Sequence, residues 1–307
     1  MVTAGTRGSA NRAVLAGVLP VLLVAAFAAA PQMERRTVYV TALDRDGKPV
    51  PGLTADDFRI KEDGRVREVA RVEAAIQPMQ IALLLDDGGP SLGATRQAAG
   101  QFVERLQGKS TFSLITTGGQ PKTRVSFTED PRVLYGALQN LFANPAPTTQ
   151  LLDSLVEVAR NFVRRKAPRP VIVAIIAEGE ELSDVRADVV LQAVQQSRAV
   201  FYYIGLGVPV ISGTRPPLQA DRAADSTEHA SVQRNVVIGA APKNSGGRSE
   251  QVLQPSGLLP MMEQFAAELR LGQYAVTYFT NSDRGKLEVD TPRPGVKLRA
   301  PARVGDK

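Results

Sequence analysis

Side chains that carry oxygen follow two apolar runs in the middle of the chain. Asp86 comes directly after residues 80–85 and Glu178 directly after residues 171–177, while Thr149 precedes a segment with helical spacing. Because the carboxyl ends of parallel strands meet at one edge of an open α/β sheet, these three side chains are expected to converge there. Two carboxylates and a hydroxyl suit a hard cation such as Mg²⁺. The alternative is that they cap helices and turns, which residues of these types often do.

Several other classes of chemistry lack the residues that they need. The chain has 307 residues, with 37 Lys and Arg, 31 Asp and Glu, no cysteine and a single histidine, His229. Disulfides, thiolate metal sites and a cysteine nucleophile are therefore excluded. One histidine also leaves little room for a zinc site or a catalytic triad. His229 has no acid or nucleophile at a diagnostic spacing, so we interpret it as a surface residue.

Nucleotide and nucleic-acid binding have no support in the sequence. No phosphate-binding loop, dinucleotide fingerprint, zinc-protease motif or serine-hydrolase motif occurs. The basic residues are spread along the chain rather than interleaved with aromatic residues, and the net charge of +6 is mild. We therefore expect neither a nucleotide nor a nucleic acid as the ligand.

The first thirty residues have the pattern of an export signal. Arg7 and Arg12 precede the apolar run 13–30, which ends in small residues, as in a secretory signal peptide. The alternative is an uncleaved membrane anchor, although the run is a little shorter than the roughly 20 residues that a membrane helix needs. Under both readings residues 1–30 precede the folded part, and the protein is expected in the periplasm or outside the cell.

Both ends of the remaining chain have the alternating pattern of β-strands. Asp63-Gly64 separates two such runs and is a strong hairpin signal, because its tight turn needs positive φ at both positions. The C-terminal end carries the same pattern in residues 273–280, 286–290 and 296–299. Neither set of strands is large enough to close a core alone. Residues 36–76 and 272–304 are therefore predicted to pair as the two halves of one β-sandwich.

Between these halves the hydrophobic pattern changes. Continuous apolar runs, which are typical of strands buried on both faces of a parallel sheet, occupy residues 80–85, 112–116, 171–177 and 199–206. Stripes of apolar residues with helical spacing separate them. Residues 79–270 are therefore predicted to form a doubly wound α/β domain inserted between the halves of the sandwich. The polar, proline-containing residues 209–234 are predicted to form a mobile surface loop.

Six blocks in a fixed order give the chain a family resemblance. They are VYVTALDRDGKPVPGLTADDFRIKEDG, IALLLDDGG, TTQLLDSLVEVA, SGGR, AAELRLGQYAVTYFT and PRPGVKLRAPARVG. Together they resemble bacterial proteins related to von Willebrand factor type A domains, which are especially frequent in acidobacteria. The resemblance covers most of residues 36–304. It implies a von Willebrand A-type fold, with six mostly parallel strands flanked by helices, and in many relatives a metal-ion-dependent adhesion site.

The adhesion-site motif of that family is incomplete in this sequence. It consists of D-x-S-x-S after the first strand, a threonine in a later loop and an aspartate after the fourth strand. By resemblance, Asp86 and Thr149 match, Glu178 replaces the aspartate, and Gly88 and Pro90 stand where the two serines should be. Glycine and proline offer no side-chain oxygen, so two protein ligands of the ion are lost. Binding of Mg²⁺, Mn²⁺ or Ca²⁺ at this degenerate site is expected to be weak, and no cofactor is required.

The same edge of the sheet is the expected contact surface. Starting the motif at Asp87 would recover a hydroxyl from Ser91, but it moves the carboxylate away from the strand end. The crevice is expected to be lined by Asp87, Gly88, Gly89, Ser91, Thr148 and Glu180. Rigid scaffolds place recognition on loops. The leading hypothesis is therefore an exported, non-enzymatic module that binds an unidentified protein partner at this edge, without needing a metal ion.

Two other functions stay open. An aspartate after a buried strand, Asp86, could be the nucleophile of a metal-assisted phosphoryl hydrolase, although such enzymes carry D-x-D and residue 88 is glycine. Alternatively, the protein could be a structural component of a cell-envelope assembly. In that case an exposed edge strand of the β-sandwich would pair with a neighbour, and the α/β domain would act as a spacer.

Overall fold

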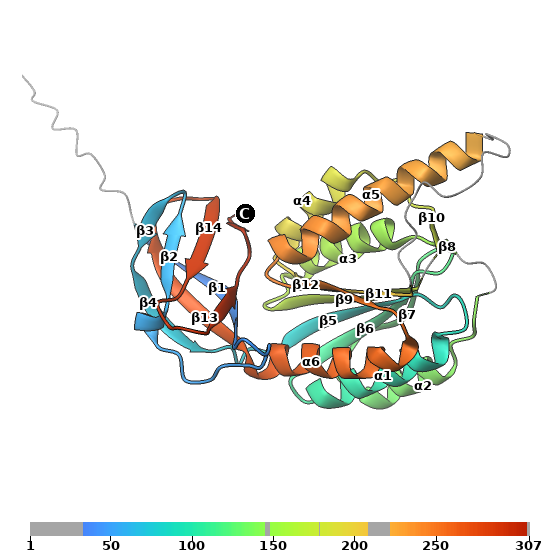
Figure 1. The fold of residues 1–307 in the computed structure, drawn as a ribbon, viewed down its shortest axis with the longest axis horizontal. Helices are drawn as coiled ribbons and strands as arrows, with labels where there is room; N and C mark the ends of the chain where they lie inside the picture. Colours follow the sequence, from blue (N-terminus) through green and yellow to red (C-terminus); the bar gives the residue numbers. More distant parts are fainter. Residues whose placement is uncertain (1–32, 145–147, 178, 208–221, 306–307) are drawn as a thin grey trace, which may run out of the picture. The chain divides into compact units, whose positions relative to one another are not determined.

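The computed structural model describes residues 33–144, 148–177, 179–207 and 222–305. Over these ranges the chain forms a six-stranded sheet, two four-stranded sheets and a two-stranded pair (Figure 1). The predicted export segment, residues 1–30, lies outside the described residues. None of the described helices is long and apolar enough to cross a membrane.

The six-stranded sheet is the centre of the α/β domain, and its strands follow the order β12-β11-β9-β5-β6-β7. Neighbouring strands run parallel except for β7, which runs antiparallel to β6. The strands are β5 (Met79–Leu85), β6 (Ser110–Thr116), β7 (Lys122–Thr128), β9 (Pro170–Ala177), β11 (Val200–Leu206) and β12 (Arg248–Val252). The predicted mostly parallel sheet of six strands is confirmed.

Helices cover both faces of this sheet (Figure 1). One face packs against α1 (Leu92–Leu106), α2 (Pro131–Gln139) and α6 (Leu258–Leu271), and the other against α3 (Leu151–Arg165), α4 (Ala187–Ser197) and α5 (Arg222–Asn244). Successive residues of β5 point to opposite faces: Ile81 and Leu83 belong to one core, and Ala82 and Leu84 to the other. Both faces are buried, which explains why the central strands read as continuous apolar runs.

Strands from both ends of the described chain form two further sheets, with the orders β15-β1-β13-β4 and β16-β14-β2-β3. They are β1 (Glu34–Leu43), β2 (Arg59–Glu62), β3 (Arg65–Arg67), β4 (Val69–Ala74), β13 (Gln273–Thr280), β14 (Gly285–Asp290), β15 (Lys297–Arg299) and β16 (Arg303–Val304). Val40, Ile60 and Val276 are buried in the core that they share. The predicted Asp63-Gly64 hairpin is confirmed, with φ values of 49° and 75°.

The prediction of a loop over residues 209–234 is wrong in its last part. Helix α5 begins at Arg222, and residues 209–221 lie outside the described residues. Ala230, Val237 and Ala241 are buried, and their spacing places them on one face of the helix. Glu228 and His229, two polar residues of that stretch, are exposed. A narrow apolar stripe therefore packs α5 against the domain.

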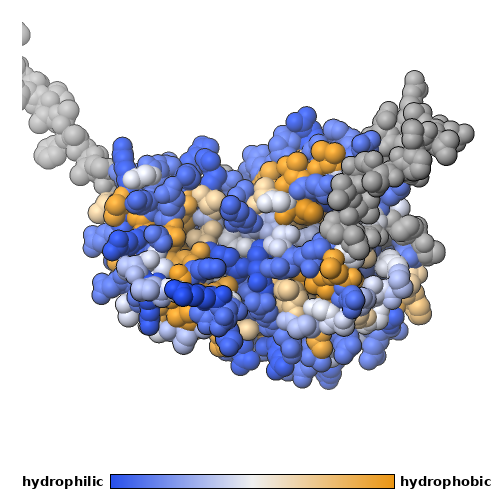
Figure 2. Space-filling model, viewed as in Figure 1, coloured by the Kyte–Doolittle hydropathy of each residue, from blue (hydrophilic) through white to orange (hydrophobic). Residues whose placement is uncertain are grey.

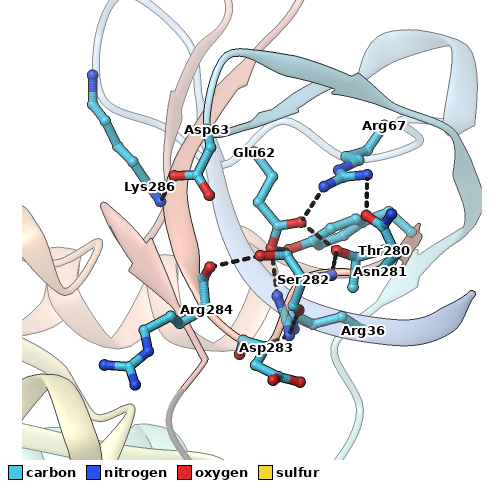
Figure 3. Close-up of polar contacts among 11 residues, drawn as sticks. Arg36, Glu62, Asp63, Arg67, Thr280, Asn281, Ser282, Asp283, Arg284 and Lys286 are labelled. Atoms are coloured by element: carbon cyan, nitrogen blue, oxygen red, sulfur yellow. Dashed lines mark hydrogen bonds and ion pairs between the residues drawn. The ribbon is translucent and has the colours of Figure 1, made fainter. Parts of the chain in front are cut away.

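A buried carboxylate joins the two sheets of the sandwich (Figure 3). Glu62, at the end of β2, accepts hydrogen bonds from the hydroxyls of Tyr278 (3.2 Å) and Thr280 on β13. It also pairs with Arg36 on β1 and with Arg67 on β3 (3.2 Å). A buried charge is tolerated only where it is paired and hydrogen-bonded. Glu62 meets both conditions by drawing partners from both sheets.

Glu62→Gln is expected to destabilise the fold by about 3 kcal/mol, because it leaves two guanidinium groups without their buried counter-charge. Urea unfolding followed by circular dichroism measures this change. Glu288→Gln is the matched control, since Glu288 pairs with Lys286 at the exposed surface, where ion pairs contribute little. Equal losses of stability from the two substitutions would contradict the role assigned to Glu62.

Candidate functional site

Asp86 directly follows β5 and is buried at the carboxyl edge of the central sheet. Its backbone N–H donates to the carbonyl of Ile175 on β9 (2.9 Å), and its Oδ1 accepts from the N–H of Gly88 (2.8 Å). The second bond forms an Asx turn, so the carboxylate shapes the loop that follows it. Gly89 continues this loop with a φ of 74°, which favours glycine. Ser91 ends the loop as the residue before α1.

Thr149 reaches the same edge from the segment before α3. It is fully buried, and its hydroxyl donates to Oγ1 of Thr117, which follows β6 (3.1 Å). Thr148 and Thr149 form β8 (Thr148–Thr149), which pairs in parallel with β10 (Glu180–Glu181). This register sets Thr148 opposite Glu180 and Thr149 opposite Glu181. The structure therefore brings two of the predicted crevice residues, Thr148 and Glu180, side by side.

Asp87 makes its contacts with a different part of the chain from Asp86. Its carboxylate pairs with Arg124 on β7 (3.3 Å), and its carbonyl accepts from the N–H of Asn144 (2.7 Å). A Cβ added at Gly118 would lie 2.2 Å from Oδ1 of Asp87, so only glycine leaves room for this carboxylate. If the adhesion motif started at Asp87, its first carboxylate would therefore already be paired with Arg124.

Two residues that the sequence analysis did not select, Glu181 and Arg234, lie at this site. Glu181 is fully buried, and its Oε1 accepts from the hydroxyl of Ser183 (2.6 Å). Arg234 extends from α5, and its Nη1 donates to the carbonyl of Gly179 (2.9 Å), in the segment between β9 and β10. Arg234 brings a positive charge to an edge that already holds Asp86 and Glu181.

Burial controls the ionisation of the two carboxyl groups. It raises the pKa of Asp86 from 3.8 to about 6, while the N–H of Gly88 and the charge of Arg234 act in the opposite direction. Burial also raises the pKa of Glu181, against the hydroxyl of Ser183 and the charge of Arg234. The edge therefore holds two acids whose charge is costly and one guanidinium that offsets part of that cost.

The adhesion motif supplies few side-chain oxygens for a small divalent cation at this edge. Mg²⁺ requires near-octahedral coordination by oxygen, but Gly88 and Pro90 carry no side-chain oxygen. Arg234 adds positive charge to the same region. Glu178, the third predicted ligand, lies outside the described residues. Within the described ranges no three His, Cys, Asp or Glu side chains form a group suited to a metal ion.

The sequence contains a signal for Arg234 but none for Glu181. Arg234 lies four residues after Ala230 and three before Val237, so the helical spacing of the buried residues places it on their side of α5. Glu181 looks like its neighbour Glu180, and only the pairing of β10 makes one buried and the other exposed. His229, also on α5, is exposed, as predicted.

Asp86→Asn is expected to stabilise the chain at neutral pH. Because the pKa of Asp86 is raised in the folded state, the folded chain holds this proton more tightly than the unfolded chain. The resulting stability is present below pH 3.8 and is lost as the pH rises through about 6. Above that pH the ionised carboxylate costs about 3 kcal/mol, which an asparagine avoids while its Oδ1 still accepts from Gly88.

Urea unfolding in EDTA at pH 4 and at pH 7.5 tests this prediction. The gain from Asp86→Asn should be large at the higher pH and small at the lower one. Asp188→Asn, at an exposed aspartate on α4, is the matched control and should show no such gain. A variant that is less stable than the parent at pH 7.5 would show that the ionised carboxylate is needed for the fold.

Among known proteins, the chain is similar to several solved structures. No protein-family model matches the chain, and no curated protein sequence matches it. Proximal thread matrix protein 1 from the mussel byssus matches at 12% identity and a TM-score of 0.47, over 74% of this chain and 50% of that one. A von Willebrand factor type A structure from Catenulispora acidiphila matches at 13% identity and 0.46, over 84% and 75%. The vWF domain of the pili tip protein Mfa5 from Porphyromonas gingivalis matches at 11% identity and 0.44, over 65% and 97%.

The chain spans about half the length of the mussel structures that it matches. At these identities and scores the similarity says nothing about the ligand of this chain. The fold stands on the topology described above: parallel strands in the order β12-β11-β9-β5-β6, an antiparallel β7 at one edge, and helices on both faces. The chain has a von Willebrand A-type α/β fold.

Proposed function

We propose that this chain is an exported, metal-independent module that binds a protein partner at the carboxyl edge of its central sheet. The observation that carries this proposal is a pair of apolar side chains exposed on segments next to Asp86 and Thr149. Phe142 is 82% exposed and Leu182 is 40% exposed. Aromatic and aliphatic side chains presented in this way are typical anchors of protein interfaces.

The segments that carry these anchors are tied to the site by backbone hydrogen bonds. Leu182 donates its N–H to the carbonyl of Thr149 (2.8 Å). Phe142 lies two residues before Asn144, whose N–H donates to the carbonyl of Asp87 (2.7 Å). A partner would therefore meet side chains whose backbone is already held in place. Preorganisation of this kind lowers the entropic cost of binding.

The charges at the site support binding without a metal ion. Arg234 places a guanidinium near Asp86 and Glu181, where a metal ion would otherwise supply the positive charge. The Oδ1 atom of Asp86 is already engaged by the N–H of Gly88. The same contact, together with the burial of Asp86, favours a binding role over a nucleophilic one, because a nucleophile must be accessible to its substrate.

The anchors can be tested by partner capture. The immobilised chain is exposed to envelope and secreted proteins of the organism that encodes it, and the retained proteins are quantified by mass spectrometry. Phe142→Asp and Leu182→Asp are each expected to reduce retention of the partner by at least about tenfold, as for interface residues that contribute most of the binding energy.

Val163→Asp is the matched control for these variants. Val163 is 50% exposed on α3, about 18 Å along the helix axis from the end of α3 at the site. Its substitution is expected to leave capture unchanged. Unchanged capture by the Phe142 and Leu182 variants, with both folded, would place the contact surface elsewhere.

Metal independence has a separate test. Calorimetric titration of Mg²⁺ or Mn²⁺ into the chain is expected to give no binding heat up to millimolar concentrations, and partner capture is expected to be the same in EDTA. Thr149→Ala serves as the reference variant. Binding of either ion that this substitution abolishes would show that the edge still forms a metal site, and would contradict this part of the proposal.

A further inference from the structure

A second concave surface lies between the sandwich and the α/β domain. This groove has a volume of about 590 Å³ and includes residues 36–39 of β1 in its lining. Its other walls come from the start of β9 and β11, from α4, and from the strands β14 and β16. Figure 2 shows hydrophobic surface on the helices of the α/β domain beside this hollow. Because β9 and β11 begin here, the groove lies at the amino edge of the central sheet, opposite the proposed partner site.

The part of β1 in the groove has an open edge. β1 pairs with β13 along residues 34–41, but on its other side β15 pairs only with residues 41–43. In the part of the chain that the structure describes, no strand pairs with residues 34–40 on that side. An uncovered strand edge presents unpaired N–H and C=O groups, which form a template for a further strand.

The backbone of Thr37 and Tyr39 faces this open edge. Ala42 donates its N–H to the carbonyl of Gly272, on the β13 side. The register of β1 with β13 has no shift from residue 34 to residue 41, so the direction of the backbone groups alternates regularly along β1. Thr37 and Tyr39 therefore point their N–H and C=O groups away from β13 and toward the groove.

The residues that line the groove include two chemically distinct groups, one apolar and one basic. The wall from the α/β domain is largely apolar, with Pro170, Leu191, Val194 and Val200 among its residues. The charged residues of the lining are all basic: Arg36, Arg198, Lys286 and Arg303.

Two of these cations are already paired, since Arg36 contacts Glu62 and Lys286 contacts Glu288. The other two, Arg198 and Arg303, are exposed. Neither has an ion-pair partner among the described residues. They are therefore available to an acidic ligand.

We propose that the groove binds an extended segment of a partner protein in which apolar and acidic side chains alternate, and that this segment adds a strand to the open edge of β1. Side chains of a strand alternate between its two faces, so one set would contact the apolar wall and the other set would reach the basic residues. Main-chain hydrogen bonds to Thr37 and Tyr39 would hold the segment, as in other cases of strand addition.

Fluorescence anisotropy with the full chain tests this proposal. The probe is a labelled hexapeptide of alternating valine and aspartate, and the matched control probe is a hexapeptide of alternating valine and lysine. The aspartate probe is expected to bind at least tenfold more tightly. The backbone amides of a bound strand fall into two alternating sets, and only one set of the probe faces β1. N-methylation of that set should abolish binding of the aspartate probe. Equal affinities of the aspartate and lysine probes, or no binding of the aspartate probe, would overturn the proposal.

Variants of the chain separate the two parts of the contact. Arg198→Glu combined with Arg303→Glu is expected to weaken binding of the aspartate probe by at least tenfold and to strengthen binding of the lysine probe. Arg71→Glu, at an exposed residue of β4 in the same sheet, should change neither. Thr37→Pro removes one N–H that faces the groove, leaves the β13 ladder in place, and should also weaken binding by about tenfold or more.

Hydrogen exchange gives a readout that does not depend on any substitution. The amides of Thr37 and Tyr39 should exchange quickly in the free chain and slowly with the aspartate probe, while the amide of Val38, which faces β13, stays protected throughout. Protection at other amides only would overturn the proposal. Saturable binding of dodecanoate without binding of the peptide would also overturn it, and would identify a site for an amphiphilic anion. Failure here leaves the variants at Phe142 and Leu182 informative, because they test the opposite edge of the sheet.

Discussion

The chain passes between the sandwich and the α/β domain twice, and the buried side chain of Arg169 binds both crossings. Its guanidinium donates to the carbonyls of Ala75 (3.0 Å) and Gln77 (3.2 Å) on the first crossing. It also donates to the carbonyl of Leu269 (2.7 Å) and to Oε1 of Gln273 (2.5 Å) on the second. Burial lowers the pKa of Arg169 to about 10, so the side chain stays charged at neutral pH. The insertion of one domain into the other depends on this residue, because buried carbonyl groups need hydrogen-bond partners.

Arg169 also helps to align the first residues of neighbouring strands in the central sheet. Arg169 directly precedes β9, and its carbonyl accepts from the N–H of Gln80 on β5 (3.1 Å). Met79 donates in turn to the carbonyl of Lys109, directly before β6 (3.1 Å). Three neighbouring strands therefore begin together. Since β5 and β6 both have seven residues and β9 has eight, they also end together, and the loops after them form one continuous edge.

A second buried contact joins the two domains at another point. Glu268 on α6 is fully buried and pairs with Arg248 on β12 (3.3 Å) and with Arg299 on β15. Tyr202 lies beside them, and burial raises its pKa. Arg169 and Glu268 thus fix the sandwich to the α/β domain through different strands. The groove between the two domains has walls held by these contacts rather than by the linkers alone.

Hydrophobic pattern predicted most of the fold because it depends on how many faces of an element are buried. Ile81 and Ala82 enter different cores, so their strand had to be apolar throughout, and the sequence displays this directly. A buried charged residue produces no such pattern in the sequence. Glu62 follows Ile60 by two residues, so both side chains point into the core. A glutamate in an exposed surface strand would look the same in the sequence. Only its partners from distant segments make its burial possible, and no local pattern reveals them.

The buried acidic residues in the described part of the chain share one solution. Each has an arginine side chain from a distant segment of the sequence nearby, and these acids are Glu62, Asp86, Asp87, Glu181 and Glu268. An arginine of the chain is present as soon as the fold forms, whereas a bound divalent ion ties a site to the concentration of that ion. The proposed contact surface at the carboxyl edge would therefore be complete upon folding, and its affinity for a partner would be set by Phe142 and Leu182 and by the rigidity of the loops that carry them.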